Sequence, residues 1–293
     1  LKDESSLKNA IRQYAPDVVF HAAAYKHVHL VENNPLSSIL NNIDGTRQLL
    51  KICEDAGIQN FLMISTDKAV NPAGVMGATK RVCELLVTDS AKRQKANYCS
   101  VRFGNVLGSS GSLIPLLKQQ IENGGPVTVT HPDMTRFFML IPEAVSLVLR
   151  AATVSKPGDV SILKMGEPIR IVEVAKSLIA LLGRTESEIP IVFTGLRPGE
   201  KLFEELYITG EELETEDPDI LTIPSGDTAG VEARELELLP EKVNTMIEKA
   251  RSGSPEALYI LNEIVKSNYS SQTSSQDRGT VYELPTPAAT KGH

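Results

Sequence analysis

Short apolar runs of strand length alternate with longer amphipathic runs along most of this chain. The runs that predict strands cover residues 17–20, 60–65, 97–103, 127–130, 160–163 and 189–193. Between them the sequence predicts helices over residues 36–56, 75–93, 113–122 and 169–182. Three of these helices are followed by glycine, which readily adopts the left-handed conformation that ends a helix. This alternation predicts an α/β fold with a doubly wound, mostly parallel, Rossmann-like sheet.

The regular alternation loosens near residue 130, which suggests a division of the chain. We expect residues 1–130 to be the remainder of a dinucleotide-binding Rossmann domain with its first strands missing, because no Gly-x-Gly-x-x-Gly element precedes a predicted helix. Residues 131–224 predict a smaller substrate-binding lobe, with one stretch that returns to the sheet. Residues 225–267 predict a helical C-terminal segment. Residues 268–293 are polar and rich in Ser, Thr and Pro, and predict a disordered tail.

Charge and cysteine content exclude several classes of partner. The chain has 30 Lys and Arg against 37 Asp and Glu, and the resulting net charge of -7 repels nucleic-acid backbones. Its three cysteines form no Cys-x-x-Cys pair, which indicates a reducing compartment and predicts no metal site. No apolar run reaches the roughly 18 residues of a membrane-spanning helix, and no signal segment opens the chain. We therefore expect a cytoplasmic protein.

The densest group of chemically active residues is Ser65-Thr66-Asp67-Lys68, at the carboxyl end of a predicted strand. Ligands bind at this edge of open α/β sheets. An adjacent acid and amine can there act as proton donor and acceptor. A turn capped by Asp67 beside a solvated Lys68 explains the same residues equally well.

One helical turn separates Met76 from Lys80, so the two side chains share a helix face. The run Met76-Gly77-Ala78-Thr79-Lys80 resembles the Tyr-x-x-x-Lys element of extended short-chain dehydrogenase/reductases, with Met in place of Tyr. Taken alone, a core methionine and a surface lysine would produce the same spacing.

Other segments strengthen this resemblance over residues 1–224. They cover residues 21–28, 41–46, 65–80, 102–108, 133–138 and 197–201. Together they resemble the polysaccharide-biosynthesis branch of that superfamily, the UDP-N-acetylglucosamine 4,6-dehydratases. The methionine resembles that of long members, which carry transmembrane helices and a first Rossmann half ahead of this segment. The resemblance thus implies a parent protein anchored at the cytoplasmic face of the inner membrane.

The resemblance implies a UDP-sugar substrate, an NAD cofactor, with NADP left open, and a homo-oligomer. Oxidation at sugar carbon 4 makes the carbon 5 hydrogen acidic, water leaves from carbon 6, and the hydride returns to carbon 6. The implied roles are general acid for Asp67, base at carbon 5 for Lys68, and partner of the carbon 4 oxygen for Thr66. Met76 has no titratable proton, and the acceptor of the 4-hydroxyl proton stays open.

The resemblance also assigns binding residues, with Lys80 on the nicotinamide ribose. Cofactor contacts are predicted at His21, Ala22, Ala23, Asn41, Ser65, Lys80 and Arg102. Substrate contacts are predicted at Lys26, His27, Asn105, Arg136, Arg197 and Glu200. Individually, the arginines also suit surface ion pairs, and Asn105 suits a turn.

Two alternatives stay open at this point. A nucleotide-sugar epimerase or reductase would use the same fold, although such epimerases keep the tyrosine and lack the Asp67-Lys68 pair. A remnant that binds a UDP-sugar without turning it over would account for the absent glycine-rich element.

Overall fold

The computed structural model describes residues 1–109, 111–210, 212–225 and 233–267. The predicted disordered tail, residues 268–293, lies outside the described residues. Within the described ranges, no helix combines the length and the apolar character needed to cross a membrane.

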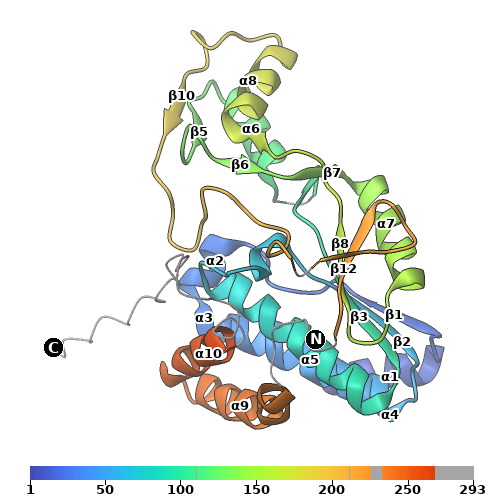
Figure 1. Cartoon of the computed structure of the whole chain (residues 1–293). Helices are drawn as coiled ribbons and strands as arrows, with labels where there is room; N and C mark the ends of the chain where they lie inside the picture. The colour runs from blue at the N-terminus through green and yellow to red at the C-terminus, as the bar shows by residue number, and fades with distance from the viewer. Residues whose placement is uncertain (110, 211, 226–232, 268–293) are drawn as a thin grey trace, which may run out of the picture.

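A six-stranded sheet forms the centre of the molecule (Figure 1). Its strand order is β1 (Val18–His21), β2 (Asn60–Ile64), β3 (Asn97–Arg102), β8 (Val160–Leu163), β12 (Ile220–Ile223) and β11 (Leu213–Glu214). The first four strands are parallel to their neighbours, whereas β12 runs antiparallel to β8 and β11 antiparallel to β12. The predicted Rossmann-like, mostly parallel sheet is thus confirmed.

Helices cover both faces of this sheet, as a doubly wound fold requires. On one face lie α4 (Gly45–Asp55) and α5 (Val75–Gln94), with α9 (Ala233–Arg251) and α10 (Glu256–Ser267) packed outside α5 (Figure 1). This layer also contains α1 (Glu4–Tyr14), α2 (Val28–Asn33), α3 (Pro35–Ser38) and the π-helix Ile39–Asp44. Its core includes Ile43, Phe61, Val82, Tyr98 and Met246. α5 is buried along most of its length because it lies between the sheet and the C-terminal helices.

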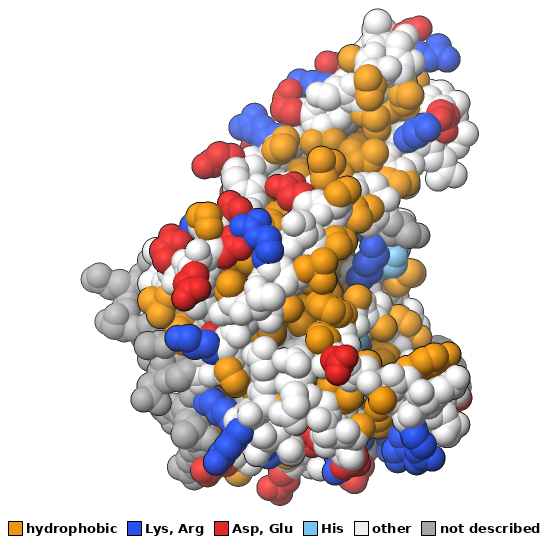
Figure 2. All heavy atoms as spheres, turned by 90° about the vertical axis from the view of Figure 1, so that its right-hand side faces the viewer, with side chains coloured by type: hydrophobic (Ala, Val, Ile, Leu, Met, Phe, Trp, Pro, Cys, Tyr) orange, Lys and Arg blue, Asp and Glu red, His pale blue; other side chains and the backbone are white. Residues whose placement is uncertain are grey.

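The opposite face is covered by α7 (Ile141–Val154), which contacts β3 and β8. Leu147 and Ala151 pack there against Val101 and Ile162. The sequence pattern did not predict this helix. Its outward side leaves several apolar side chains exposed, and hydrophobic side chains gather on this side of the molecule in Figure 2.

A smaller lobe projects beyond one edge of the sheet (Figure 1). It contains β5 (Val127–Val129) paired with β10 (Ile191–Phe193), β6 (Thr135–Arg136) paired with β9 (Ile169–Arg170), α6 (Leu113–Glu122) and α8 (Ile171–Leu181). Its own core joins Leu117, Val127, Ala175 and Ile179. β4 (Asn105–Leu107) pairs with β7 (Phe138–Leu140). The predicted strands 127–130 and 189–193 therefore pair with each other outside the main sheet.

Candidate active site

The chain leaves β2 at the carboxyl edge of the sheet and forms the short 3-10 helix η2 (Asp67–Ala69). The Ser65 N–H donates to the Val101 carbonyl at 2.7 Å, and the Asp67 N–H donates to the Phe103 carbonyl at 3.1 Å. The Thr66 hydroxyl oxygen accepts a hydrogen bond from the Lys68 N–H at the start of η2. These bonds fix the backbone beside β3, so that the side chains of η2 have defined directions.

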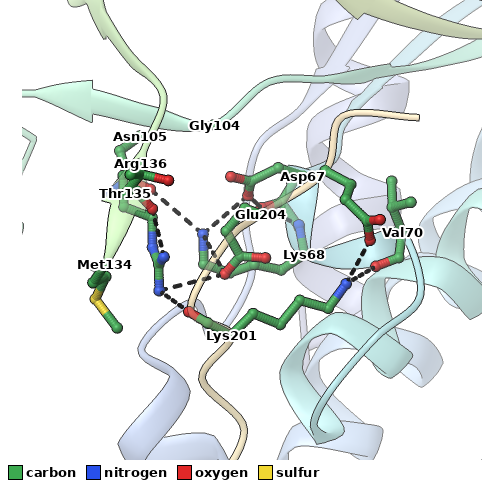
Figure 3. A network of polar contacts seen from close by, with 12 residues as sticks. Asp67, Lys68, Val70, Gly104, Asn105, Met134, Thr135, Arg136, Lys201 and Glu204 are labelled. Atoms are coloured by element: carbon green, nitrogen blue, oxygen red, sulfur yellow. Dashed lines mark hydrogen bonds and ion pairs between the residues drawn. The ribbon is translucent and has the colours of Figure 1, made fainter. Parts of the chain in front are cut away.

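Asp67 and Lys68 are in direct contact at this edge (Figure 3). Lys68 Nζ donates to Asp67 Oδ1 at 2.9 Å and lies 3.4 Å from Asn105 Oδ1, and the Thr66 hydroxyl donates to Asp67 Oδ1 at 2.8 Å. The Asp67 side chain is fully buried and that of Lys68 is only 21% exposed. Asp67 Oδ2 has no hydrogen-bond partner among the described residues. A buried acid in contact with an amine can exchange a proton with it directly.

Arg136 and Glu204 extend this network toward the lobe. The Arg136 guanidinium donates to the carbonyls of Thr135, Lys201 and Leu202 at 2.7–3.2 Å. Its Nη2 also lies 3.6 Å from Glu204 Oε1, which is 3.8 Å from Lys68 Nζ. Arg136 therefore binds the segment that carries Glu204, and its predicted contacts with substrate stay predictions.

The sequence prediction missed Glu204, although its buried carboxyl group faces the predicted catalytic lysine. Burial raises the pKa of this carboxyl group. The sequence offers only a weak indication of this role, because Glu204 is one of two adjacent glutamates between Phe203 and Leu206. Only the tertiary structure distinguishes it from Glu205, whose side chain is half exposed.

Met76 and Lys80 lie on the first turns of α5, and both are buried. Gly77 allows α5 to lie this close to η2. A side chain at residue 77 would clash, because its Cβ would lie 2.0 Å from the Lys68 carbonyl oxygen. α5 thus meets η2 backbone to backbone, and Met76 lines a small cavity together with Lys68, Lys201 and Glu204. Gly77 is visible in the sequence, but only the structure shows that the Lys68 carbonyl group lies against it.

Lys80 provides a test of whether the predicted cofactor residues suit a dinucleotide. Burial lowers the pKa of Lys80, and within the described part of the chain its Nζ has no hydrogen bond or ion pair. A buried amine without such a partner suits ligand oxygens such as ribose hydroxyls.

The nearby His21 is buried and its Nε2 lies 2.9 Å from the Thr46 hydroxyl. Burial and the charge of Lys80 lower the pKa of His21 to about 3, so its ring is neutral.

The loop after β1 carries exposed Ala22, Ala23 and Lys26 and the half-buried His27. This loop is held by Asn42, which accepts from the Tyr25 N–H at 2.7 Å and donates to the Tyr25 carbonyl at 3.1 Å. The predicted Asn41 donates to Asn42 Oδ1 at 3.1 Å. Sequence reasoning missed Asn42 as the anchoring residue, although it lies in the same conspicuous Asn41-Asn42 pair.

Ser65 and Arg102 belong to a separate buried cluster around Glu84. Arg102 donates to both carboxylate oxygens of Glu84 at 2.7 and 2.6 Å, and the Ser65 hydroxyl donates at 2.6 Å. These bonds keep Glu84 ionised, and its pKa falls to about 2 mainly because of Arg102. These two predicted cofactor residues thus have structural partners.

Arg197 and Glu200 lie in one turn. The Arg197 N–H donates to Glu200 Oε2 at 3.2 Å, and the Arg197 side chain is exposed. The structure thus joins Thr66, Asp67, Lys68, Asn105 and Arg136 in one network. Among the described residues no bond links Arg197 or Glu200 to that network, and their predicted contacts with substrate stay predictions.

The comparisons with known proteins agree with this architecture. Polysaccharide biosynthesis protein EpsC of Bacillus subtilis, described as probable, is 52% identical over 72% of this chain and 35% of its own length. A UDP-glucose 4-epimerase of Rickettsia bellii is 37% identical over 74% of this chain and 63% of its own. The chain thus spans about one third of the length of EpsC.

Solved structures show the same fold. Pen from Bacillus thuringiensis is 35% identical, with a TM-score of 0.71 over 77% of this chain and 69% of its own. A double mutant of the dTDP-glucose 4,6-dehydratase DesIV of Streptomyces venezuelae, solved with NAD bound, is 20% identical, with a TM-score of 0.63 over 70% of this chain and 68% of its own. The family described as polysaccharide biosynthesis protein matches residues 1–224. This chain therefore belongs to the polysaccharide biosynthesis protein family.

Proposed function

We propose that this chain carries the catalytic residues of a nucleotide-sugar 4,6-dehydratase that uses NAD and acts on UDP-N-acetylglucosamine. The observation that carries the proposal is the contact between buried Asp67 and Lys68 at the carboxyl end of β2. Dehydration requires an acid for the departing hydroxyl and a base for the carbon 5 hydrogen. Neighbouring side chains that exchange a proton provide both.

When bound, NAD supplies a hydride acceptor at carbon 4 and returns that hydride to carbon 6. Lys68 Nζ takes the proton from carbon 5, while Asp67 gives a proton to the carbon 6 hydroxyl, which leaves as water. Lys68 later returns its proton to carbon 5. Asp67 must regain one proton in each turnover, and oxidation at carbon 4 releases one from the 4-hydroxyl group. The released proton must therefore reach Asp67. The Thr66 hydroxyl, 2.8 Å from Asp67 Oδ1, is the relay that we propose for it.

Lys80, His21 and the loop after β1 would hold the cofactor, because they combine a buried amine, a neutral ring and exposed backbone at the carboxyl edge of the sheet. The exposed Arg197 has a guanidinium that suits a diphosphate group. Arg136 already donates to three carbonyls, so we propose that it shapes the site for the sugar instead.

A second candidate is a 4-epimerase, which the Rickettsia relative favours. Epimerisation moves a hydride at carbon 4 without loss of water, so it needs no acid at carbon 6. The Asp67–Lys68 contact and the methionine at position 76 favour dehydration, because epimerases of this superfamily keep a tyrosine at that position and lack the acid–lysine pair.

Mass spectrometry of the gene product that carries this sequence, incubated with NAD and UDP-N-acetylglucosamine, tests the proposal. We expect a product that has lost one water, and we expect Lys68→Met to slow its formation by about 100-fold or more. Lys118→Met is the matched control, since Lys118 is an exposed lysine on α6. A UDP-sugar of unchanged mass but altered configuration would support the epimerase. Binding without turnover would contradict both enzymes.

A further inference from the structure

Glu204 is the second carboxylate that faces Lys68. Its side chain is 3% exposed, and Oε1 lies 3.8 Å from Lys68 Nζ and 3.6 Å from Arg136 Nη2. In Figure 3, dashed lines join the Glu204 carboxylate to both of these cations. A single acid thus connects the lysine of the sheet edge with the arginine of β6.

The remaining oxygen of Glu204 makes this position unusual. Oε2 is buried and has no hydrogen-bond partner among the described residues, as is also true of Asp67 Oδ2. A buried carboxylate oxygen without a donor costs free energy, so such groups concentrate at functional sites. The charged groups that face Glu204 are Lys68, Asp67, Arg136 and Lys201. Two acids therefore act on one lysine amine.

We propose that Glu204 is a positioning residue that holds the proton on Lys68 Nζ and so sets the fraction of Lys68 in the base form. The inference rests on the proposed function for its catalytic meaning, but the charge effect itself needs no substrate. A nearby negative charge favours the ammonium form, whereas the Arg136 charge disfavours it. With Glu204 neutralised, only Asp67 would offset the charge of Arg136 at Lys68, and the amine form would become more abundant.

Amine labelling measures this effect directly. The protein is treated briefly with N-hydroxysuccinimidyl acetate at several pH values, and acetylation of Lys68 is quantified by peptide mass spectrometry. Because only the neutral amine reacts, we expect Lys68 in Glu204→Gln to react about tenfold faster than in the wild type near neutral pH. Lys118 serves as an internal reference in every sample.

Two variants separate charge from other effects. Glu205→Gln removes the adjacent, half-exposed carboxylate, which binds Lys201, and should leave the labelling of Lys68 unchanged. Glu204→Asp keeps the charge in a shorter side chain and should label closer to the wild type than Glu204→Gln does. Equal labelling of the Asp and Gln variants would show that access rather than charge matters, and would overturn the proposal. An unchanged rate in Glu204→Gln would overturn it too.

Thermal melting first establishes that each variant folds. If Glu204→Gln does not fold, Glu204→Met removes the same charge from a side chain of similar size: Lys68 should again label faster than in the wild type, and slower or equal labelling overturns the proposal. Labelling uses neither NAD nor sugar, so an absence of dehydration refutes the proposed function alone. In an active protein, the rising limb of kcat against pH should move to lower pH in Glu204→Gln and stay in place in Glu205→Gln.

Discussion

Replacing Glu84 by glutamine removes the charge at the centre of the most buried ion-pair cluster on α5. The Glu84 side chain is 1% exposed and that of Arg102 is 2% exposed. Arg102 binds both carboxylate oxygens, while Arg81 and Ser65 bind one each. Glutamine keeps the size of the side chain but removes the carboxylate charge that Arg102 binds at both oxygens.

The size of the effect follows from the pKa of Glu84. Its value of about 2, against the ordinary 4.5, corresponds to about 3 kcal/mol of folding stability. Loss of one partner from a buried ion pair costs a similar amount, about 3–5 kcal/mol. Because the folded-state pKa is lowered, this stabilisation is fully present above pH 4.5 and is lost as the pH falls toward 2.

Urea unfolding followed by circular dichroism measures the effect. At pH 7 we expect Glu84→Gln to lose about 3 kcal/mol, and the difference from the wild type should shrink as the pH falls below 4.5. Glu122→Gln, in an exposed pair with Lys118 on α6, should cost less than about 1 kcal/mol. A loss for Glu84→Gln no larger than that of this control would refute the reasoning.

Three further outcomes follow from other contacts. The His21 ring should stay neutral when the pH falls from 7 to 4, because its pKa is about 3, and a ring nitrogen that protonates near 6.5 in an NMR titration would contradict this. Gly77→Ala should lower the melting temperature, since its Cβ would meet the Lys68 carbonyl at 2.0 Å, and an unchanged melting temperature would show that α5 does not pack so closely against η2. Tyr98→Phe should cost about 1–3 kcal/mol in urea unfolding, because its buried hydroxyl donates to the Ile58 carbonyl at 2.8 Å, and a neutral effect would argue against that bond.

The regular part of the fold could be predicted from local pattern. The predicted strand 160–163 and helix 113–122 have the same bounds in the structure. The helix over 141–154 was missed because the alternation of strands and helices loosens in this part of the chain, although Glu143, Ser146 and Arg150 recur with helical spacing. The pairing of the strands could not be predicted either. β5 and β10 have the sequence pattern of strands in the main sheet, yet they pair with each other because the lobe has its own core.

The candidate site shows the same limit. Asp67 and Lys68 are adjacent in the chain, so their contact follows from local geometry once the strand end is placed. Glu204 lies far along the sequence, and its loop is held near Lys68 by tertiary contacts, among them Arg136 with the Lys201 and Leu202 carbonyls. For Arg102, no local pattern indicated that Glu84 on α5 would face β3.

The most direct test of the proposed dehydration is the fate of the carbon 5 hydrogen. The gene product is incubated with NAD and UDP-N-acetylglucosamine in deuterated water, and the product is examined by mass spectrometry and NMR. In this solvent the exchangeable hydrogens of the Lys68 amine are deuterium. If Lys68 takes the carbon 5 proton and then reprotonates carbon 5, the product will lack one water and carry solvent deuterium at carbon 5. A turned-over sugar that keeps its carbon 6 hydroxyl and its original carbon 5 hydrogen would contradict the proposal.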